Sequence, residues 1–454
     1  MAERTIVTLG DTLAALVEGK KYTTLRDILV TMNAVDVAAI FEDMPQDKLP
    51  LLFRLLPKEL AAETFVEMDP ETQELLIQGF SDNELKDVVD ELYVDDAVDI
   101  VEEMPANVVK RILKQADPEM RKMINEILKY PDDSAGSIMT TEYVSLRPNM
   151  TVEEAIKRIR RVGVDKETIY TCYVMDEKRR LEGVVTVKDL LMNDYAALMG
   201  DIMDPHVIKA YTTEDQEKVV ETFNEYNLLS LPVVDGEDRL VGIITVDDVM
   251  DVMEQEATED FEKMAAMLPS EKPYLKTGVF QLARNRIPWL MILMLSSMVT
   301  GGILLKYENA FSVIPLLVTF IPMLMDTGGN SGSQASTMII RGMAVGEVEP
   351  ADILKVMWKE IRVGMLCGLS LALVNFVRLM IQYPGQVLIC LTVVISLFCT
   401  VIIAKTIGCV LPIAAKTIHL DPAIMASPMI TTIVDACSLM IYFQLACHLL
   451  NMKA

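Results

Sequence analysis

The sequence predicts a multidomain membrane protein, in which an acidic helical domain and a duplicated α/β domain precede a helical membrane domain. Three observations predict it: a change of charge near residue 273, an internal duplication, and a series of long apolar segments. The chain has 454 residues, of which 51% are hydrophobic, and a net charge of −25. Residues 1–272 carry 58 acidic and 29 basic side chains, whereas residues 273–454 carry 8 and 12. An acidic soluble part therefore precedes an apolar part that is slightly basic.

Composition and motifs exclude several classes of function. The acidic part lacks the basic surface that nucleic-acid binding requires, so no nucleic acid is expected as a partner. The seven cysteines show no spacing typical of zinc sites or disulfide frameworks. No P-loop, nucleophile elbow or metalloprotease helix is present, so we expect no enzyme. The N-terminus lacks the features of a signal peptide, which predicts that residues 1–272 stay in the cytoplasm.

Residues 1–132 are predicted to form an all-α domain. Prolines recur there at intervals of about twelve residues or a multiple, and the segments between them show helical spacing of apolar residues. A repeat of this size favours a helical superhelix. The alternative is a plain helical domain in which the prolines only mark helix starts.

Residues 133–198 and 199–250 are two copies of one unit. The stretch GVVTVKD at 183–189 matches GIITVDD at 242–248, and each copy begins with an Ile-Met pair. Each copy predicts the order strand, helix, strand, turn, strand, helix. The segment resembles a tandem pair of CBS domains. The resemblance implies a regulatory module and makes ATP a candidate ligand, with a ribose near the pairs Thr186 with Asp189 and Thr245 with Asp248.

Residues 251–272 are predicted to form an acidic connecting helix, and residues 273–454 a transmembrane domain. Five segments are long and apolar enough to span a bilayer core of about 30 Å. They cover about 287–306, 310–341, 361–381, 387–413 and 422–450. We expect a multi-pass protein of the plasma (inner) membrane, and the distribution of Lys and Arg predicts a cytoplasmic N-terminus and an outside C-terminus.

Two of these segments contain candidate ion ligands. Asp435 lies midway along the fifth, where a carboxylate is costly unless it faces water or a partner. The alternative is a protonated Asp435 that hydrogen-bonds a neighbouring helix. The second contains Asp326 and Asn330 in the stretch MDTGGNSGSQ. Pro322 and the Gly328-Gly329 pair are expected to weaken this helix and free carbonyl groups, or else to allow close helix packing.

The candidate ligands are all oxygen atoms, which favours Mg²⁺, Ca²⁺ or Mn²⁺ over zinc or copper. The small number of carboxylates favours a cation that keeps part of its water, as Mg²⁺ does.

The whole chain resembles the MgtE family of magnesium channels. The resemblance lies in the domain order and in TEDFEK, PMLMDTGGNSGSQASTMIIR and LDPAIMASPMITTIVDACSLMIYF. It implies a homodimer whose pore is lined by the second and fifth spans, where Asp435 holds hydrated Mg²⁺ with Thr431 and Ser427 below it. It implies a connecting helix that plugs the pore, and Asp248 facing Asp95 or Asp96. The implied regulatory cation ligands are Asp95, Asp96, Asp248, Asp251, Glu256, Glu259, Asp260, Glu308 and Asp421.

The predicted function is a Mg²⁺-selective channel that imports Mg²⁺ and is closed by high cytoplasmic Mg²⁺. The acidic domains should repel one another when the cation is scarce and be bridged when it is abundant. A secondary transporter of divalent cations is one alternative, although the five spans show no inverted repeat. A membrane-anchored CBS nucleotide sensor without transport is the other, and Asp435 argues against it.

Overall fold

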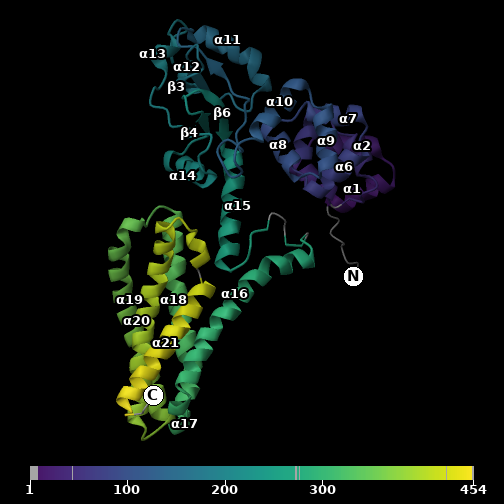
Figure 1. The fold of residues 1–454 in the computed structure, drawn as a ribbon. Helices are drawn as coiled ribbons and strands as arrows, with labels where there is room; N and C mark the ends of the chain where they lie inside the picture. The colour runs from purple at the N-terminus through teal and green to yellow at the C-terminus, as the bar shows by residue number, and fades with distance from the viewer. Residues whose placement is uncertain (1–8, 43, 271–273, 276, 426, 452–454) are drawn as a thin grey trace, which may run out of the picture. The chain divides into compact units, whose positions relative to one another are not determined.

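The computed structural model describes the chain except for residues 1–8, 43, 271–273, 276, 426 and 452–454 (Figure 1). The described residues form two compact units, Met1–Met253 and Glu254–Ala454.

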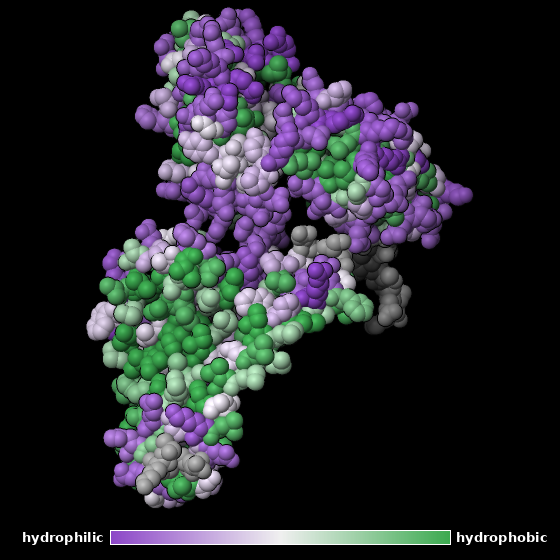
Figure 2. Space-filling view, in the orientation of Figure 1, coloured by the Kyte–Doolittle hydropathy of each residue, from purple (hydrophilic) through white to green (hydrophobic). Residues whose placement is uncertain are grey.

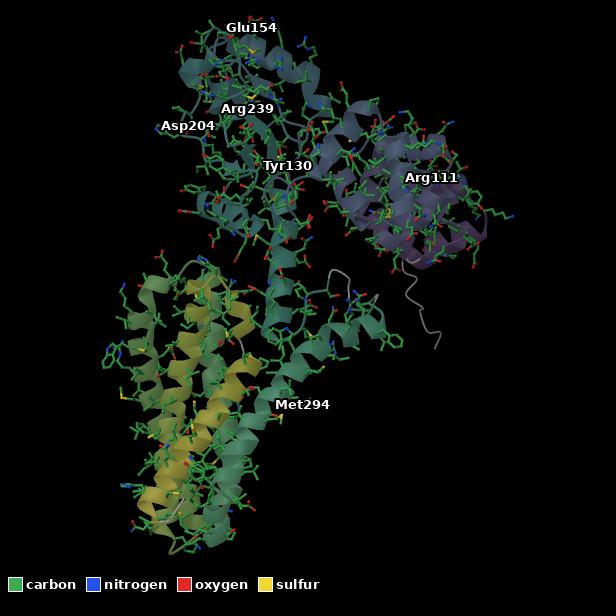
Figure 3. All side chains as sticks on the ribbon, viewed as in Figure 1. Arg111, Tyr130, Glu154, Asp204, Arg239 and Met294 are labelled. Carbon is green, nitrogen blue, oxygen red and sulfur yellow. The ribbon has the colours of Figure 1, made fainter. Side chains whose placement is uncertain are left out.

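The first part of the Met1–Met253 unit is a stack of short helices. Helices α3, α5, α7 and α9 pack in succession, as expected for a superhelix. Pro70 and Pro118 occupy first helical positions, and the preceding Asp69 and Asp117 accept hydrogen bonds from the free backbone N–H groups. Arg111 of α9 donates to the carbonyl oxygens of Ile77 and Phe80 (Figure 3). The helices are α1 (Leu9–Glu18), α2 (Tyr22–Leu29), α3 (Ala34–Glu42), α4 (Leu49–Phe53), α5 (Lys58–Val66), α6 (Pro70–Gly79), α7 (Asp82–Val89), α8 (Val94–Glu103), α9 (Ala106–Gln115) and α10 (Pro118–Ile127).

The duplicated segment forms two small α/β units with the predicted order of elements. Each sheet has three strands, of which the first two are parallel and the last two antiparallel. The first unit contains β1 (Ser145–Leu146), α11 (Val152–Val162), the 3₁₀ helix η1 (Gly163–Asp165), β2 (Thr171–Met175), β3 (Leu181–Thr186) and α12 (Val187–Met192). The second contains α13 (Met199–Ile202), β4 (Ala210–Tyr211), α14 (Gln216–Tyr226), β5 (Ser230–Val234), β6 (Leu240–Thr245) and the start of α15.

The two copies pack reciprocally through their repeated motifs. Thr140 pairs with Ile243 of β6, and Asp204 pairs with Val184 of β3. The Ile-Met pair that begins each copy packs on the glycine of the other copy: a Cβ on Gly242 would lie 2.6 Å from the Met139 sulfur, and one on Gly183 would lie 2.7 Å from the Met203 sulfur. The repeated residues therefore form part of the contact between the two copies.

The connecting helix differs from the predicted 251–272. It is the second half of α15 (Val246–Met264), which continues without a break from the second CBS unit. Thr245 begins the helix by hydrogen-bonding Asp248 (Oγ1 to Oδ2, 2.6 Å). The helix ends where Ala266 adopts a positive φ of 56°, a conformation that cannot continue a right-handed helix.

The Glu254–Ala454 unit is a helical bundle with an apolar surface (Figure 2). Four of its helical stretches are long and apolar enough to cross a membrane, by length and composition, among the residues that are described. The helix of the predicted third span begins earlier, at Ile353, and the helix of the predicted fourth span ends later, at Thr417. The elements are α16 (Val279–Lys306), α17 (Glu308–Val313), η2 (Pro315–Phe320), α18 (Ile321–Ala344), η3 (Pro350–Asp352), α19 (Ile353–Gln382), α20 (Val387–Thr417), η4 (Pro422–Met425) and α21 (Ser427–Leu449).

The second predicted span, 310–341, is not one helix. The chain forms α17 and η2 before α18 begins at Ile321, because Pro315 and Pro322 each begin a new element. The expectation that Pro322 and the Gly328-Gly329 pair loosen this segment is wrong, since α18 is continuous from Ile321 to Ala344. Helix α18 is not one of the four apolar stretches, because it contains polar residues. It nevertheless packs against both α20 and α21.

Candidate functional site

Helices α18 and α21, which carry the predicted pore residues, pack at very close range. A Cβ on Gly328 would lie 3.0 Å from Val434 Cγ1, and one on Gly332 would lie 2.8 Å from Ile430 Cγ2. A Cβ on Gly408 of α20 would overlap the carbonyl oxygen of Gly332. The glycines therefore serve close packing, which is the second of the two predicted explanations.

A polar stripe runs along the other face of α18. Asp326, Asn330, Gln334 and Thr337 are spaced three or four residues apart, and all four are exposed in the single chain. Exposed side chains of this kind are costly against hydrocarbon. The stripe must therefore face water or another protein surface when the bundle is in a membrane.

Asp435 lies on α21, half-buried, one helical turn beyond Thr431. The Asp326 carboxylate is near enough to interact with it electrostatically, and among the described residues no donor hydrogen-bonds the Asp435 carboxylate. The Thr431 hydroxyl donates to the carbonyl oxygen of Pro428 at 2.9 Å, which leaves its lone pairs available to a cation. The structure thus places Asp435, Thr431 and Asp326 in one region, whereas the side chain of Ser427 lies outside the described residues.

A second group of carboxyls lies inside the Met1–Met253 unit, where α8 approaches the start of α15. Asp95 is 8% exposed, and its Oδ1 has no hydrogen-bond partner. Glu167 Oε2 is likewise buried without a partner. Asp248 interacts electrostatically with Asp95, Asp96, Asp99 and Glu167. The structure therefore brings the predicted residues Asp95, Asp96 and Asp248 together and adds Asp99 and Glu167 to them.

Burial is the main cause of the raised pKa values in this acidic cluster, and repulsion between the carboxylates adds to it. Burial and Asp248 raise the pKa of Asp96 to about 6, of Asp99 to about 7 and of Glu167 to about 8. Burial also raises the pKa of Asp95 well above its usual range and that of Asp248 to about 6. Near neutral pH the raised pKa values keep Glu167 mostly protonated and Asp99 partly protonated, and a bound cation would favour the ionised forms.

The described residues hold no group of three His, Cys, Asp or Glu side chains that converges as the ligands of one metal ion do. The acidic cluster is looser than such a centre. Its geometry suits a cation that binds through one or two carboxylates and keeps several waters, which is the usual behaviour of Mg²⁺ in proteins.

The second half of α15 meets the membrane bundle within the Glu254–Ala454 unit. Lys263 Nζ lies 2.5 Å from Glu259 Oε1 and 2.7 Å from Asp421 Oδ2. Burial and the nearby Asp421 raise the pKa of Asp260. The predicted residues Glu259, Asp260 and Asp421 are thus neighbours, with a lysine between two of them that the sequence analysis did not single out.

The remaining predicted residues lie beside these groups or elsewhere in the fold. Asp251 follows Asp248 on α15 and adds to the repulsion that raises the pKa of Asp248, and Glu256 lies further along the same helix. Glu308 begins α17, at the end of the bundle opposite to α15 (Figure 1), so Glu308 and Asp421 cannot share one site within a chain. Thr186 and Asp189 form the capping box of α12, with 2.6 Å between Oγ1 and Oδ2. The pairs predicted to lie near a ribose therefore have a structural function at two helix starts.

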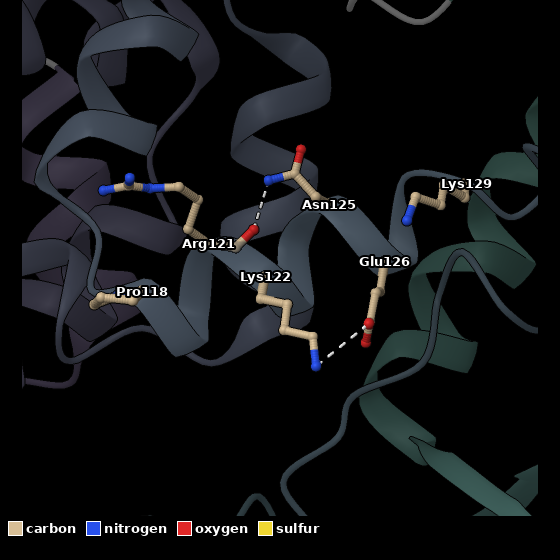
Figure 4. A pocket seen from close by; sticks show the side chains of 6 residues that line it. All are labelled: Pro118, Arg121, Lys122, Asn125, Glu126 and Lys129. Atoms are coloured by element: carbon tan, nitrogen blue, oxygen red, sulfur yellow. Dashed lines mark hydrogen bonds and ion pairs between the residues drawn. The ribbon is translucent and has the colours of Figure 1, made fainter.

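A shallow hollow on α10 contrasts with the acidity around it (Figure 4). It is lined by Arg121, Lys122 and Lys129 together with Glu126, whose Oε1 lies 3.7 Å from Lys122 Nζ. It contains none of the predicted site residues.

Comparisons with known proteins match every part of the chain. The MgtE family of divalent cation transporters matches residues 321–445, the MgtE intracellular N domain matches 32–133, and CBS domains match 135–194 and 199–255. The magnesium transporter MgtE of Thermus thermophilus is 37% identical, and the match covers 99% of this chain and 100% of that protein. The chain belongs to the MgtE family. The magnesium transporter MgtE of Bacillus subtilis is 30% identical over 95% of each chain.

Two solved structures each match about half of the chain. One is the cytosolic domain of the Mg²⁺ channel MgtE in complex with ATP, with a TM-score of 0.52 and 37% identity over 54% of this chain and all of that chain. The other is the soluble part of a magnesium transporter, with a TM-score of 0.52 and 30% identity over 55% of this chain and 98% of that one. The family assignment agrees with the predicted fold class of a helical superhelix, a CBS pair and a helical membrane domain.

Within this MgtE chain, sequence reasoning missed several charged residues. Asp99 lies one turn from Asp95 on α8, so helical spacing would have found it. Glu167 is distant in sequence from the rest of the acidic cluster, and no motif or spacing in the sequence identified it as a member. Lys405 lies at the end of an apolar run in α20, where it is 5% exposed and its Nζ is 4.0 Å from Glu360 Oε2.

Proposed function

We propose that the chain is a Mg²⁺-selective channel of the plasma membrane, which imports Mg²⁺ as a homodimer and is closed by high cytoplasmic Mg²⁺. The observation that carries the proposal is the polar stripe of α18, which runs through a membrane bundle beside Asp435. A second copy of the chain would cover this stripe and enclose a water-filled path between the two bundles. The names of relatives that cover nearly the whole chain identify Mg²⁺ as the cargo.

In this proposal Asp435 attracts the cation, and two copies in a dimer supply two carboxylates to it. Thr431 lies one turn away, and Asp326 and Asn330 add oxygen atoms from α18. Mg²⁺ gives up its water reluctantly, so these groups bind the hydrated ion through its water shell. Asp435 and Asp326 are stronger members of the set than Thr431 and Asn330, because a carboxylate carries a full charge when ionised.

The gate in this proposal consists of the two acidic groups of the cytoplasmic part. Without Mg²⁺ the carboxylates of the acidic cluster repel one another, and so do Glu259, Asp260 and Asp421. Cation binding removes that repulsion and favours the closed state, as linkage requires for a ligand that prefers one of two states. In this proposal the N-terminus lies in the cytoplasm and, with five spans, the C-terminus lies outside.

ATP is the ligand that we propose for the CBS pair. The support is the related cytosolic domain that was crystallised in complex with ATP and is 37% identical to this chain. The N-termini of α12 and α15, where Thr186 with Asp189 and Thr245 with Asp248 lie, are the regions where a ribose would bind.

Mg²⁺ uptake by a magnesium-dependent bacterial strain tests the pore. Wild type should restore growth and uptake in low Mg²⁺, and Asp435→Asn should not, although it changes only one charge. Asp352→Asn is the matched control, because Asp352 lies in η3, before the predicted third span begins at 361, and pairs with Lys355 at 2.7 Å. Equal rescue by Asp435→Asn and wild type would refute the pore assignment.

Protease protection of the cytoplasmic part tests the gate. In the full chain, residues 1–270 should become more resistant to protease as Mg²⁺ rises into the millimolar range. Unchanged resistance over that range would refute closure by cytoplasmic Mg²⁺ while leaving transport intact.

A further inference from the structure

Helix α19 lies at one edge of the membrane bundle, where α20 is the long helix against which it packs (Figure 1). Small residues form the contact face of α19. A Cβ on Gly364 would lie 3.2 Å from Ile402 Cα, and one on Gly368 would lie 3.1 Å from Phe398 Cδ2. Because α19 is seated on α20 by this glycine face, its opposite face is directed away from α20.

The opposite face of α19 changes from basic to apolar along the helix. Leu366, Leu369 and Leu373 are 70%, 62% and 65% exposed in the single chain. Lys359 and Arg362 are exposed on the same face nearer to the start of the helix, since residues three, four or seven positions apart lie on one side. An exposed apolar face with basic groups at its end is typical of a helix that contacts lipid, with the charges among the headgroups.

The length of the uncharged segment sets the depth of these basic groups. Residues 363–377 carry no charge and rise about 22 Å, which is less than a hydrocarbon core of about 30 Å. Arg362 must therefore extend its guanidinium group along the helix towards the headgroups. Lys359 and Trp358 lie about 4–6 Å further out, at the level where tryptophan is enriched in membrane proteins. The two basic groups thus reach the level of the lipid phosphates.

Lys359 and Arg362 have no acidic partner within the part of the chain that the structure describes. The acidic residues near them in sequence are engaged elsewhere. Asp352 pairs with Lys355 at 2.7 Å, and Glu360 Oε2 lies 4.0 Å from a lysine ammonium of α20. Two positive charges on the lipid-facing side of α19 therefore lack a counter-charge from the protein.

Trp358 orders one of these two charges. The Arg362 guanidinium carbon lies 5.9 Å from the centroid of the Trp358 ring, and Arg362 Nε donates to the Trp358 carbonyl oxygen at 3.4 Å. The ring is 58% exposed and holds the guanidinium group by a cation–π contact. The terminal N–H groups of Arg362 remain available, and their fork geometry matches the oxygen atoms of a phosphate. An ordered arginine beside an unpaired lysine is suited to bind a phosphate group.

We propose that Lys359 and Arg362 bind the phosphate headgroup of an anionic phospholipid, whose acyl chains lie along Leu366 and Leu369. A zwitterionic lipid fits less well, because its own ammonium group already neutralises its phosphate. The bound lipid holds the start of α19 at the membrane surface, with the Trp358 ring at the level of the lipid glycerol. This inference goes beyond the proposed function and requires only that α19 cross a membrane.

The fluorescence of Trp358 can report the lipid beside it. The chain has two tryptophans, so Trp289→Phe leaves Trp358 as the only one. The full chain with Trp289→Phe is reconstituted in phosphatidylcholine vesicles that contain a minor fraction of one brominated lipid, either phosphatidylglycerol or phosphatidylcholine. Bromine atoms quench tryptophan fluorescence on contact. Quenching should correspond to an about ten- to thirtyfold preference for phosphatidylglycerol, as expected from two basic groups near the membrane surface.

Three variants in the Trp289→Phe chain separate charge from packing. Lys359→Gln combined with Arg362→Gln should reduce the preference to about one, because both charges are gone. Lys359→Arg combined with Arg362→Lys keeps both charges and should keep most of the preference. Arg378→Gln is the matched control, since Arg378 is an exposed cation at the other end of α19, and it should leave the preference unchanged.

Each contrary outcome would overturn the inference. Equal quenching by the two brominated lipids, or a preference that survives the double glutamine variant, would show that these charges select no lipid. Quenching by neither lipid would show that a protein surface covers Trp358. Displacement of the brominated lipid by millimolar inorganic phosphate would identify a soluble anion as the ligand. Fluorescence reports lipid contact without any flux, so failed transport in the Asp435 experiment would leave this result standing.

Discussion

The methyl group of Thr431 lies 2.9 Å from the position that a Cβ atom on Gly329 would take. Helices α18 and α21 therefore meet at this point without room for a side chain between them. Asp435 follows Thr431 by one helical turn, so the approach at Gly329 sets how far Asp435 stands from the polar stripe of α18. A glycine contact thus determines the geometry of the candidate ion pathway.

Gly329→Val should reduce Mg²⁺ uptake strongly while leaving a folded protein. The new side chain must push Thr431 away, at a cost of about 1–3 kcal/mol for overpacking. Uptake in a magnesium-dependent strain and thermal unfolding in detergent would measure the two effects. Gly301→Val in α16 is the matched control, because no atom lies within 4 Å of a Cβ there. Equal uptake by both variants would contradict a function for the close approach.

Gly242→Ala should weaken the contact between the two CBS units. Its Cβ would lie 2.7 Å from the Thr140 carbonyl oxygen, and that backbone pairs with Ile243 and cannot move freely. We expect a loss of about 1–3 kcal/mol, visible as faster hydrogen exchange in β6. Gly236→Ala is the control, since no atom lies within 4 Å of its Cβ. Equal exchange in the two variants would disprove the packing explanation of the repeated motif.

The acidic cluster should make the Met1–Met253 unit less stable as the pH rises, in the absence of divalent cations. Asp96, Asp99 and Glu167 have folded pKa values of about 6, about 7 and about 8, above those of the unfolded chain. The folded state then holds more protons than the unfolded state, so this stability is complete below about pH 4 and is lost as the pH passes the raised values. Hydrogen exchange of α8 across this range would measure the effect.

Glu167→Gln should remove the part of this pH dependence that lies near pH 8, because the amide does not titrate. Mg²⁺ should also slow exchange in α8 of wild type at high pH and do so less in the variant. Glu182→Gln, at an exposed position of β3, is the control. A pH profile shared by wild type and Glu167→Gln would show that Glu167 is not coupled to the acidic cluster.

Local sequence signals were enough for the repeated elements of this fold. The helix starts at Asp69 and Asp117 and the order of strands in each CBS unit follow from side chains close in sequence. Met139 and Gly242 belong to motifs that are repeated in the sequence. The reason for the repetition, a contact between Met139 of one copy and Gly242 of the other, became evident only from the packing of the two copies. The predicted start of the second span was wrong, because its apolar composition concealed two proline-initiated elements before most of α18.

The parts of the sites that escaped prediction depend on contacts distant in sequence. Glu167 joins Asp95 and Asp248 only when the CBS units and α8 pack together. Lys263 was visible in the TEDFEK stretch, yet its partner Asp421 lies in another segment. Spacing along the chain does not report such pairs, whereas the candidate pore residues on α18 and α21 were singled out because carboxylates are rare in apolar segments.

The Lys405–Glu360 pair should stabilise the membrane bundle only as a pair. Lys405 of α20 is buried, Glu360 of α19 is largely buried, and their charged atoms are 4.0 Å apart. Lys405→Met would leave the Glu360 charge without compensation, at a cost of up to about 3–5 kcal/mol. The double variant with Glu360→Gln removes both charges and should recover most of the loss, which thermal unfolding in detergent would measure. A double variant no more stable than Lys405→Met would mean that Lys405 stabilises the bundle through packing of its aliphatic chain rather than through its charge.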